Sequence, residues 1–249
     1  MGSFLNVVIF RLRSKESILK NRSHCLFCKR KLTWKELIPV LSFLLQKRKC
    51  LGCGKKISWQ YPLVEFFTGL IFVFIVWKFF ELSFLGIIVV CFLFLVSCFL
   101  IVIFVYDLKH YLVADKIIYP AIIAVCIWHL LFGIILKNYT SYERLAPLYG
   151  ALAAGGIFLA LVLISREKWM GWGDVKIAVF MGLLLGLYKV LLALFLAFLV
   201  GAIVSLVLIA LKKKKLKSEI PFGPFLALSA FFSLFWGINL IDWYLGLFL

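Results

Sequence analysis

The chain has 249 residues, of which 65% are hydrophobic and only 16% are charged, with a formal net charge of +17. A soluble domain is about half apolar and about a quarter charged, so this composition excludes a soluble fold. Several windows of about 20 residues carry almost no charge, which is the length that an α-helix needs to cross a bilayer. The sequence therefore predicts an all-α fold, a polytopic membrane helical bundle.

Apolar runs separated by polar breaks predict seven to eight transmembrane helices. The first run, residues 1–12, is a candidate short transmembrane segment; its basic residues Arg11 and Arg13 lie at and beyond its apolar stretch, which argues against a signal peptide. The run 174–211 is too long for one span at 1.5 Å per residue, so we divide it at Gly186 to Lys189. The other spans are expected at residues 60–80, 84–106, 116–136, 145–165, 174–187, 189–211 and 222–248.

Half of the basic charge lies in one loop, because residues 11–60 hold 14 of the 28 Lys and Arg residues. If this loop is cytoplasmic, alternate crossings bring residues 107–110, 165–168 and 212–215 to the same side. This is the positive-inside asymmetry of membrane proteins, and anionic lipid headgroups reinforce it. The net charge then reflects the orientation of the chain in the membrane, with membrane lipids as partners. We expect no nucleic-acid partner, because no stacking aromatic residues accompany Lys212 to Lys215.

Four of the seven cysteines lie in this basic loop as two CxxC pairs, Cys25 with Cys28 and Cys50 with Cys53. Such pairs can converge four thiolates on one tetrahedral zinc ion. The alternative is two disulfides, which seldom persist in the reducing cytosol. We therefore expect residues 13–60 to form a small cytoplasmic, zinc-knuckle-like domain with four cysteine ligands, in which zinc supplies folding energy.

The aspartates are the next candidates for chemistry. An ionisable group at the end of a span is costly enough that function is the default hypothesis. Asp174 follows Gly171 and Gly173, which permit close approach of another backbone. Two carboxyl groups in a partly desolvated site share a proton, as in aspartyl proteases. The alternative for each aspartate alone is a helix cap or an interfacial charge. The chain has only four: Asp107, Asp115, Asp174 and Asp242.

Taken in order, the motifs resemble those of the type IV prepilin peptidases, a bacterial GxGD family of membrane aspartyl proteases. The resemblance rests on GSFLNVVI at residues 2–9, the two CxxC pairs, ELIPVLS at 36–42, ISWQYPLVE at 57–65, GWGD at 171–174 and IPFGPF at 220–225. The chain departs from the family at Leu112 to Asp115, where relatives usually have Pro-Asp, and at Arg13, where many have Pro.

The resemblance implies an enzyme that removes the basic leader from type IV prepilins and pseudopilins at the cytoplasmic face of the bacterial cytoplasmic membrane. It implies that most members then N-methylate the new N-terminal residue with S-adenosyl-L-methionine. Asp107 and Asp174 would be the catalytic residues, supported by Gly171 and Gly173, in a transmembrane peptidase core at residues 61–249. The cysteine loop would be associated with zinc and methylation. The residues that bind the methyl donor and the oligomeric state are left open.

Two alternatives accompany this interpretation. One is a peptidase without methylation, since the sequence shows no glycine-rich loop of the familiar soluble methyl-donor sites. The other belongs to a different functional class. A non-enzymatic transporter or assembly scaffold could use Asp107 and Asp174 as ion or proton ligands. Such ligands belong near the bilayer midplane, whereas both aspartates are expected at span ends, which favours the peptidase. Glu65, at the entry of a span, is either a snorkelling or paired charge or a contact for substrate or methyl donor, and the sequence supports both interpretations.

Overall fold

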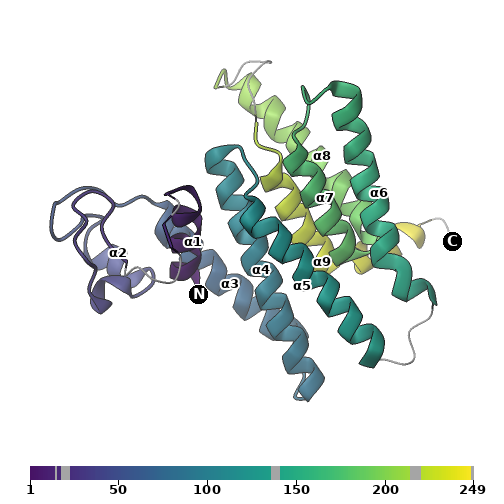
Figure 1. Cartoon of the computed structure of the whole chain (residues 1–249), viewed down its shortest axis with the longest axis horizontal. Helices are drawn as coiled ribbons and strands as arrows, with labels where there is room; N and C mark the ends of the chain where they lie inside the picture. The colour runs from purple at the N-terminus through teal and green to yellow at the C-terminus, as the bar shows by residue number, and fades with distance from the viewer. Residues whose placement is uncertain (15, 18–22, 136–140, 214–219, 248–249) are drawn as a thin grey trace. The chain divides into compact units, whose positions relative to one another are not determined.

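The computed structural model describes residues 1–14, 16–17, 23–135, 141–213 and 220–247 (Figure 1). Over this part of the chain, nine α-helices and one short 3₁₀ helix form, and the only β-type pairings are two isolated bridges, His24 with Lys31 and Lys49 with Lys56. The predicted all-α class is therefore confirmed. Contacts divide the chain into two compact units, Met1–Val102 and Ile103–Leu249, whose boundary falls within helix α4, Phe84–His110.

The first unit holds the amino-terminal helix and the cysteine loop. Its elements are α1 (Gly2–Ser14), η1 (Trp34–Leu37), α2 (Leu41–Leu45), α3 (Gln60–Phe79) and the first part of α4. Helix α1 packs so closely on α3 that a Cβ added at Gly2 would lie 2.6 Å from the Cα of Glu65. The amide of Asn6 donates to the carbonyl of Tyr61 at 3.1 Å. The glycine and the asparagine of the first motif thus seat α1 against the start of α3.

The second unit is a bundle built around a short helix. Its elements are the end of α4, α5 (Asp115–Ile135), α6 (Ser141–Ser165), α7 (Trp172–Leu185), α8 (Leu187–Ala210) and α9 (Gly223–Leu245). Helix α7 contacts α5, α6, α8 and α9, and Figure 1 shows it running among them. Its side chains Ile177, Phe180 and Met181 are fully buried. The residues at the ends of α7 are therefore held in position by the packing of α7 against its neighbouring helices.

Glycines allow α6 and α7 to meet backbone against backbone. A Cβ added at Gly182 would lie 2.4 Å from the carbonyl carbon and oxygen of Gly150. No side chain fits in that space, so the close crossing of α6 and α7 requires glycine at both positions, as in other close helix pairs within membranes.

The predicted division of the run 174–211 is confirmed, and the break has a clear physical cause. Helix α7 ends at Leu185 and α8 begins at Leu187, with Gly186 between them at φ 73° and ψ 178°, a conformation that is essentially restricted to glycine. The break leaves carbonyl groups without helical partners, which is costly in an apolar surrounding. The Nε2 of His129, on α5, hydrogen-bonds the carbonyl oxygen of Leu183 at 2.9 Å and satisfies one of them.

Within the described residues, five helices are long and apolar enough to cross a membrane: α3, α4, α6 from Arg144 onward, α8 and α9. Helix α5 covers the span expected at 116–136, except for residue 136, which lies outside the described residues. Residue 248 of the last expected span and residues 214 and 215 of the basic run also lie outside them. Helices α1 and α7 have 13 and 14 residues, or about 20 Å each, less than the ~30 Å hydrocarbon core. The membrane bundle is confirmed, while the count of seven to eight spans and the domain limits 1–12, 13–60 and 61–249 stay predictions.

Candidate active site and candidate metal centre

The second unit brings together the two aspartates that the sequence singles out. Asp107 lies in the last turn of α4 and is only 5% exposed, and Asp174 lies in the first turn of α7. Their carboxyl groups are close enough to interact electrostatically. A pair of acids at helix ends, one buried and one partly buried, has the composition of a site that shares a proton between two carboxyl groups.

The amino terminus of α9 holds Asp107 in place. The backbone N–H of Gly223, at the start of α9, donates to Oδ2 of Asp107 at 2.9 Å in a buried hydrogen bond. A Cβ added at Gly223 would lie 2.5 Å from the same oxygen, so the close approach requires glycine. Sequence reasoning missed this role of Gly223. The only signal was the Gly-Pro pair at a helix start within the motif 220–225, and this pair does not indicate that Asp107 is its contact.

The α4–α5 loop and the first residue of α5 contact α7 on the two sides of Asp174. On one side, a Cβ added at Gly173 would lie 2.6 Å from Cγ2 of Val113. On the other, Nζ of Lys176 pairs with Oδ1 of Asp115 at 2.5 Å, and the same ammonium lies 5.2 Å from the ring centroid of Tyr119. Asp115, to which the sequence pattern assigns no role, therefore links α5 to the helix that carries Asp174.

The other glycine of the motif, Gly171, has a different environment. It caps α7 with extended backbone, φ −91° and ψ 163°, and its N–H approaches Oδ2 of Asp174 at 3.4 Å. Among the described residues, a Cβ added here would meet only the nitrogen of Gly173 within 4 Å. The helix-cap interpretation of Asp174 is thus compatible with the carboxyl pair. The two glycines differ in that Gly173 is packed and Gly171 faces open space.

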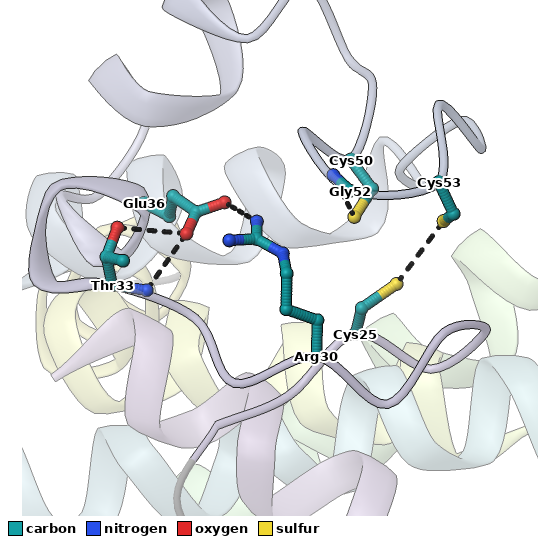
Figure 2. A network of polar contacts seen from close by, with 7 residues as sticks. All are labelled: Cys25, Arg30, Thr33, Glu36, Cys50, Gly52 and Cys53. Atoms are coloured by element: carbon teal, nitrogen blue, oxygen red, sulfur yellow. Dashed lines mark hydrogen bonds and ion pairs between the residues drawn. The ribbon is translucent and has the colours of Figure 1, made fainter.

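The four cysteines of the basic loop converge, as the spacing predicts. The sulfur atoms of Cys25, Cys28, Cys50 and Cys53 all lie within 4.8 Å of one another. The sulfurs of Cys25 and Cys53 are 3.9 Å apart (Figure 2). Four thiolates at about 2.3 Å from one tetrahedral zinc ion would stand about 3.8 Å apart, so these residues fit a metal ion of that size.

The two CxxC pairs are held by the same turn, repeated after 25 residues of sequence. In the first, Cys25 N donates to the Arg30 carbonyl and Lys29 N to the Cys25 carbonyl; in the second, Cys50 N donates to the Lys55 carbonyl and Gly54 N to the Cys50 carbonyl. Lys29 and Gly54, at equivalent positions, both have positive φ, 56° and 68°. The isolated bridges close both turns.

The thiol electrostatics of this cluster also call for a cation. The N–H groups of Cys53 and Gly52 lower the pKa of Cys50 to about 6. For Cys53, the N–H of Lys55 favours the thiolate, but burial and the sulfurs of its three neighbours outweigh it and raise the pKa to about 11. The sulfurs cannot all ionise beside one another without a compensating positive charge, which a soft divalent metal ion would provide.

Glu36 belongs to the structure of this cluster. Its Oε1 accepts from Arg30 at 2.5 Å, and its Oε2 accepts from the N–H and the hydroxyl of Thr33, each at 2.9 Å (Figure 2). Burial raises the pKa of Glu36, but these partners outweigh it and lower the pKa below its ordinary value. The Arg30 guanidinium also interacts electrostatically with Cys50. Glu36 thus orients a cation beside the sulfur cluster, in the manner of groups that support metal ligands.

Glu65 is hydrogen-bonded through both of its carboxylate oxygens. Its Oε1 accepts from the hydroxyl of Ser3 on α1. Its Oε2 accepts from the N–H of Val40, immediately before α2, at 2.8 Å. One carboxylate on α3 therefore ties together the three motifs that begin with Gly2, Glu36 and Ile57.

Together these features define a class: a polytopic all-helical membrane protein with a pair of carboxyl groups at one end of its helices and a four-cysteine module able to hold a metal ion. Residues 1–79 match the model of the bacterial peptidase A24 N-terminal domain, and residues 93–206 match that of the type IV leader peptidase family. The chain belongs to this type IV leader peptidase family.

The chain is similar to its relatives over nearly its whole length. Proteins named prepilin leader peptidase/N-methyltransferase are similar to it in several bacteria. That of Xanthomonas campestris pv. campestris is 32% identical over 98% of this chain and 91% of its own length. That of Bacillus subtilis is 32% identical over 98% and 94%, and that of Aeromonas salmonicida 31% over 99% and 90%. No solved structure matches the chain.

Proposed function

We propose that this protein removes the leader peptide from type IV prepilins and pseudopilins with Asp107 and Asp174, and N-methylates the new terminal residue with S-adenosyl-L-methionine. Family membership and the names of its relatives support the two activities. The observation that carries the assignment of the catalytic pair is the meeting of two carboxyl groups, one buried at the end of α4 and one at the start of α7.

The pair performs hydrolysis by general acid and base catalysis. One carboxyl group, ionised, takes a proton from water as the water oxygen attacks the scissile peptide carbonyl. The other, protonated, donates a hydrogen bond to that carbonyl oxygen, and a proton from the pair passes to the leaving amine as the C–N bond breaks. The N–H of Gly223 keeps Asp107 oriented through this exchange. The open face at Gly171 leaves room for an extended substrate backbone.

We place both aspartates and the cysteine loop on the cytoplasmic side. The support is the charge distribution, since half of the Lys and Arg residues lie in residues 11–60. The rival function, a transporter or scaffold with Asp107 and Asp174 as ion ligands, is less well supported. Both aspartates lie in terminal turns of their helices, whereas ligands for a transported ion belong near the midplane.

For the cysteine cluster we propose a structural zinc ion held by Cys25, Cys28, Cys50 and Cys53. When bound, zinc would tie the two turns together and contribute folding free energy that a small basic loop cannot obtain from burial. Elemental analysis of the purified protein should give about one zinc per chain, because four sulfurs complete one tetrahedral site. Cys50→Ser should lose it, and Cys126→Ser, on α5, should retain it; zinc-free wild type with four reactive thiols would contradict the proposal.

The activity is tested with purified protein in lipid and a purified prepilin. Asp107→Asn and Asp174→Asn should each lower the cleavage rate by about 10³-fold or more, because Asn can neither take nor give the proton. The matched control is Asp242→Asn on α9, an exposed aspartate whose variant should cleave normally. Cleavage at the wild-type rate by either mutant removes that residue from the catalytic pair. Labelled S-adenosyl-L-methionine tests methylation, which an unlabelled cleaved pilin would reject.

A further inference from the structure

The cysteine module exposes an apolar surface formed by η1, α2 and the residues between them, Trp34–Leu45. Trp34 is 71% exposed, and Leu41, Leu44 and Leu45 are 51%, 61% and 73% exposed. These three leucines stand at positions i, i+3 and i+4, so they share one face of α2. On the other face, Phe43 is buried and packs against Trp59, with ring centroids 5.1 Å apart. Helix α2 therefore has two distinct faces, and its exposed apolar face points away from the module.

This surface is held at the level where a membrane span begins. The N–H of Val40, the residue before α2, is bonded to Oε2 of Glu65 at 2.8 Å. Glu65 lies in the second turn of α3, about 7.5 Å along the axis from Gln60. Helix α3 has 20 residues, which at about 30 Å just match the hydrocarbon core. The start of α2 is thus bonded to α3 about 7.5 Å inside the end of the span, within the depth of about 5–10 Å to which interfacial helices bury their apolar faces.

The charge around the surface selects its partner. Residues 23–59 contain nine Lys and Arg residues but a single acid, Glu36, which is paired with Arg30. Lys35 lies 5.6 Å from the ring centroid of Trp34, so an aromatic ring and a cation stand together as they do at membrane interfaces. Such a surface suits an anionic partner, whereas a basic leader peptide would be repelled. Each Lys or Arg near an anionic bilayer strengthens the attraction.

We propose that Trp34–Leu45 is an interfacial membrane anchor, which inserts its exposed apolar side chains between the headgroups of anionic lipids and binds those headgroups through the surrounding lysines. This membrane binding is a function separate from leader cleavage. It would depend on burial of apolar side chains and attraction to anionic lipids, as for amphipathic helices that lie in the bilayer interface. A short anchor suffices here because the neighbouring span already confines the module to the membrane surface, so the insertion is effectively intramolecular.

The test uses the full chain in vesicles, without prepilin, so that its outcome is independent of the proposed activity. A genetically encoded environment-sensitive fluorophore replaces Leu45, and lipids carrying a nitroxide near the headgroup report contact by quenching. The same fluorophore at Phe67, an exposed position on α3, is the positive control. In phosphatidylglycerol vesicles, quenching at position 45 should reach about half or more of that at position 67. Replacing the lipid by phosphatidylcholine, or Lys35, Lys47 and Lys49 by Gln, should reduce it.

Three outcomes would overturn the proposal or part of it. No quenching at position 45 while position 67 is quenched would remove the anchor. Equal quenching in both lipids would reject the anionic headgroup as the partner. In a separate measurement with prepilin added, a change in fluorescence that is absent without prepilin would make the surface a substrate contact instead. Leu41→Ser with Leu44→Ser should abolish quenching, and unchanged resistance of that variant to limited proteolysis would show that its module is folded.

Discussion

The contact between Gly223 and Asp107 allows a substitution to be predicted that impairs catalysis without unfolding the protein. In Gly223→Ala, the new Cβ would start 2.5 Å from Oδ2 and 3.0 Å from Cγ of Asp107. Ordinary contact begins at 3.4 Å, so the carboxyl group must withdraw by about 0.9 Å and the 2.9 Å hydrogen bond is broken. A misplacement of about 1 Å in a catalytic group costs about 10²-fold in rate, which corresponds to about 2.7 kcal/mol of transition-state stabilisation.

The assay is cleavage of a prepilin by purified enzyme, with kcat and KM measured separately. We expect kcat to fall by about 10²-fold and KM to stay within about twofold, because the change affects the reacting groups and not substrate binding. The melting temperature should change little, since the atoms that must move are the free end of a side chain. Gly156→Ala on α6 is the control, because an added Cβ would meet no described atom within 4 Å other than its chain neighbours and its own helix backbone. Activity of Gly223→Ala within twofold of wild type would refute the reasoning.

Three further substitutions test other contacts. Gly173→Ala should lower both the cleavage rate and the melting temperature, since its Cβ would meet a side chain at 2.6 Å, whereas Gly171→Ala, whose Cβ meets none, should melt as wild type does. Asp115→Lys should cut kcat by about fivefold through loss of a pair worth about 1 kcal/mol, and adding Lys176→Asp should restore it; no rescue would deny the ion pair a role. Cys50→Ser should make the module sensitive to limited proteolysis, and wild-type resistance would contradict a structural metal.

Much of the fold could be predicted because its causes are local. Long apolar windows specify membrane helices wherever they occur, and Gly186 close to a charge marks the break between α7 and α8. The cysteine cluster was also predictable, since two CxxC pairs can serve one tetrahedral ion with few alternatives. The lengths of α1 and α7 were less predictable, because hydropathy does not show where a helix ends within an apolar run.

The supporting contacts of the site could not be predicted, because they join distant parts of the chain. Gly223 meets Asp107 across 116 residues, and Lys176 meets Asp115 across 61; neither separation carries a periodic signal. The pairing of Asp107 with Asp174 itself came from the resemblance to a family, since spacing alone left a helix cap open. Glu65 was ambiguous for the same reason, as its partners Ser3 and Val40 lie on other elements.

The repeated turns of the cysteine module have a topological consequence. Each turn supplies two sulfurs, so an ion shared between them closes the chain from Cys28 to Cys50 into a ring that contains the whole of η1 and α2. Closing such a ring removes conformational entropy from the open chain. The apolar face of α2 is then presented as a preformed surface rather than ordered at each encounter with lipid. Under the two proposals, of a bound metal ion and of an interfacial anchor, removal of the metal would weaken the contact of the module with the membrane.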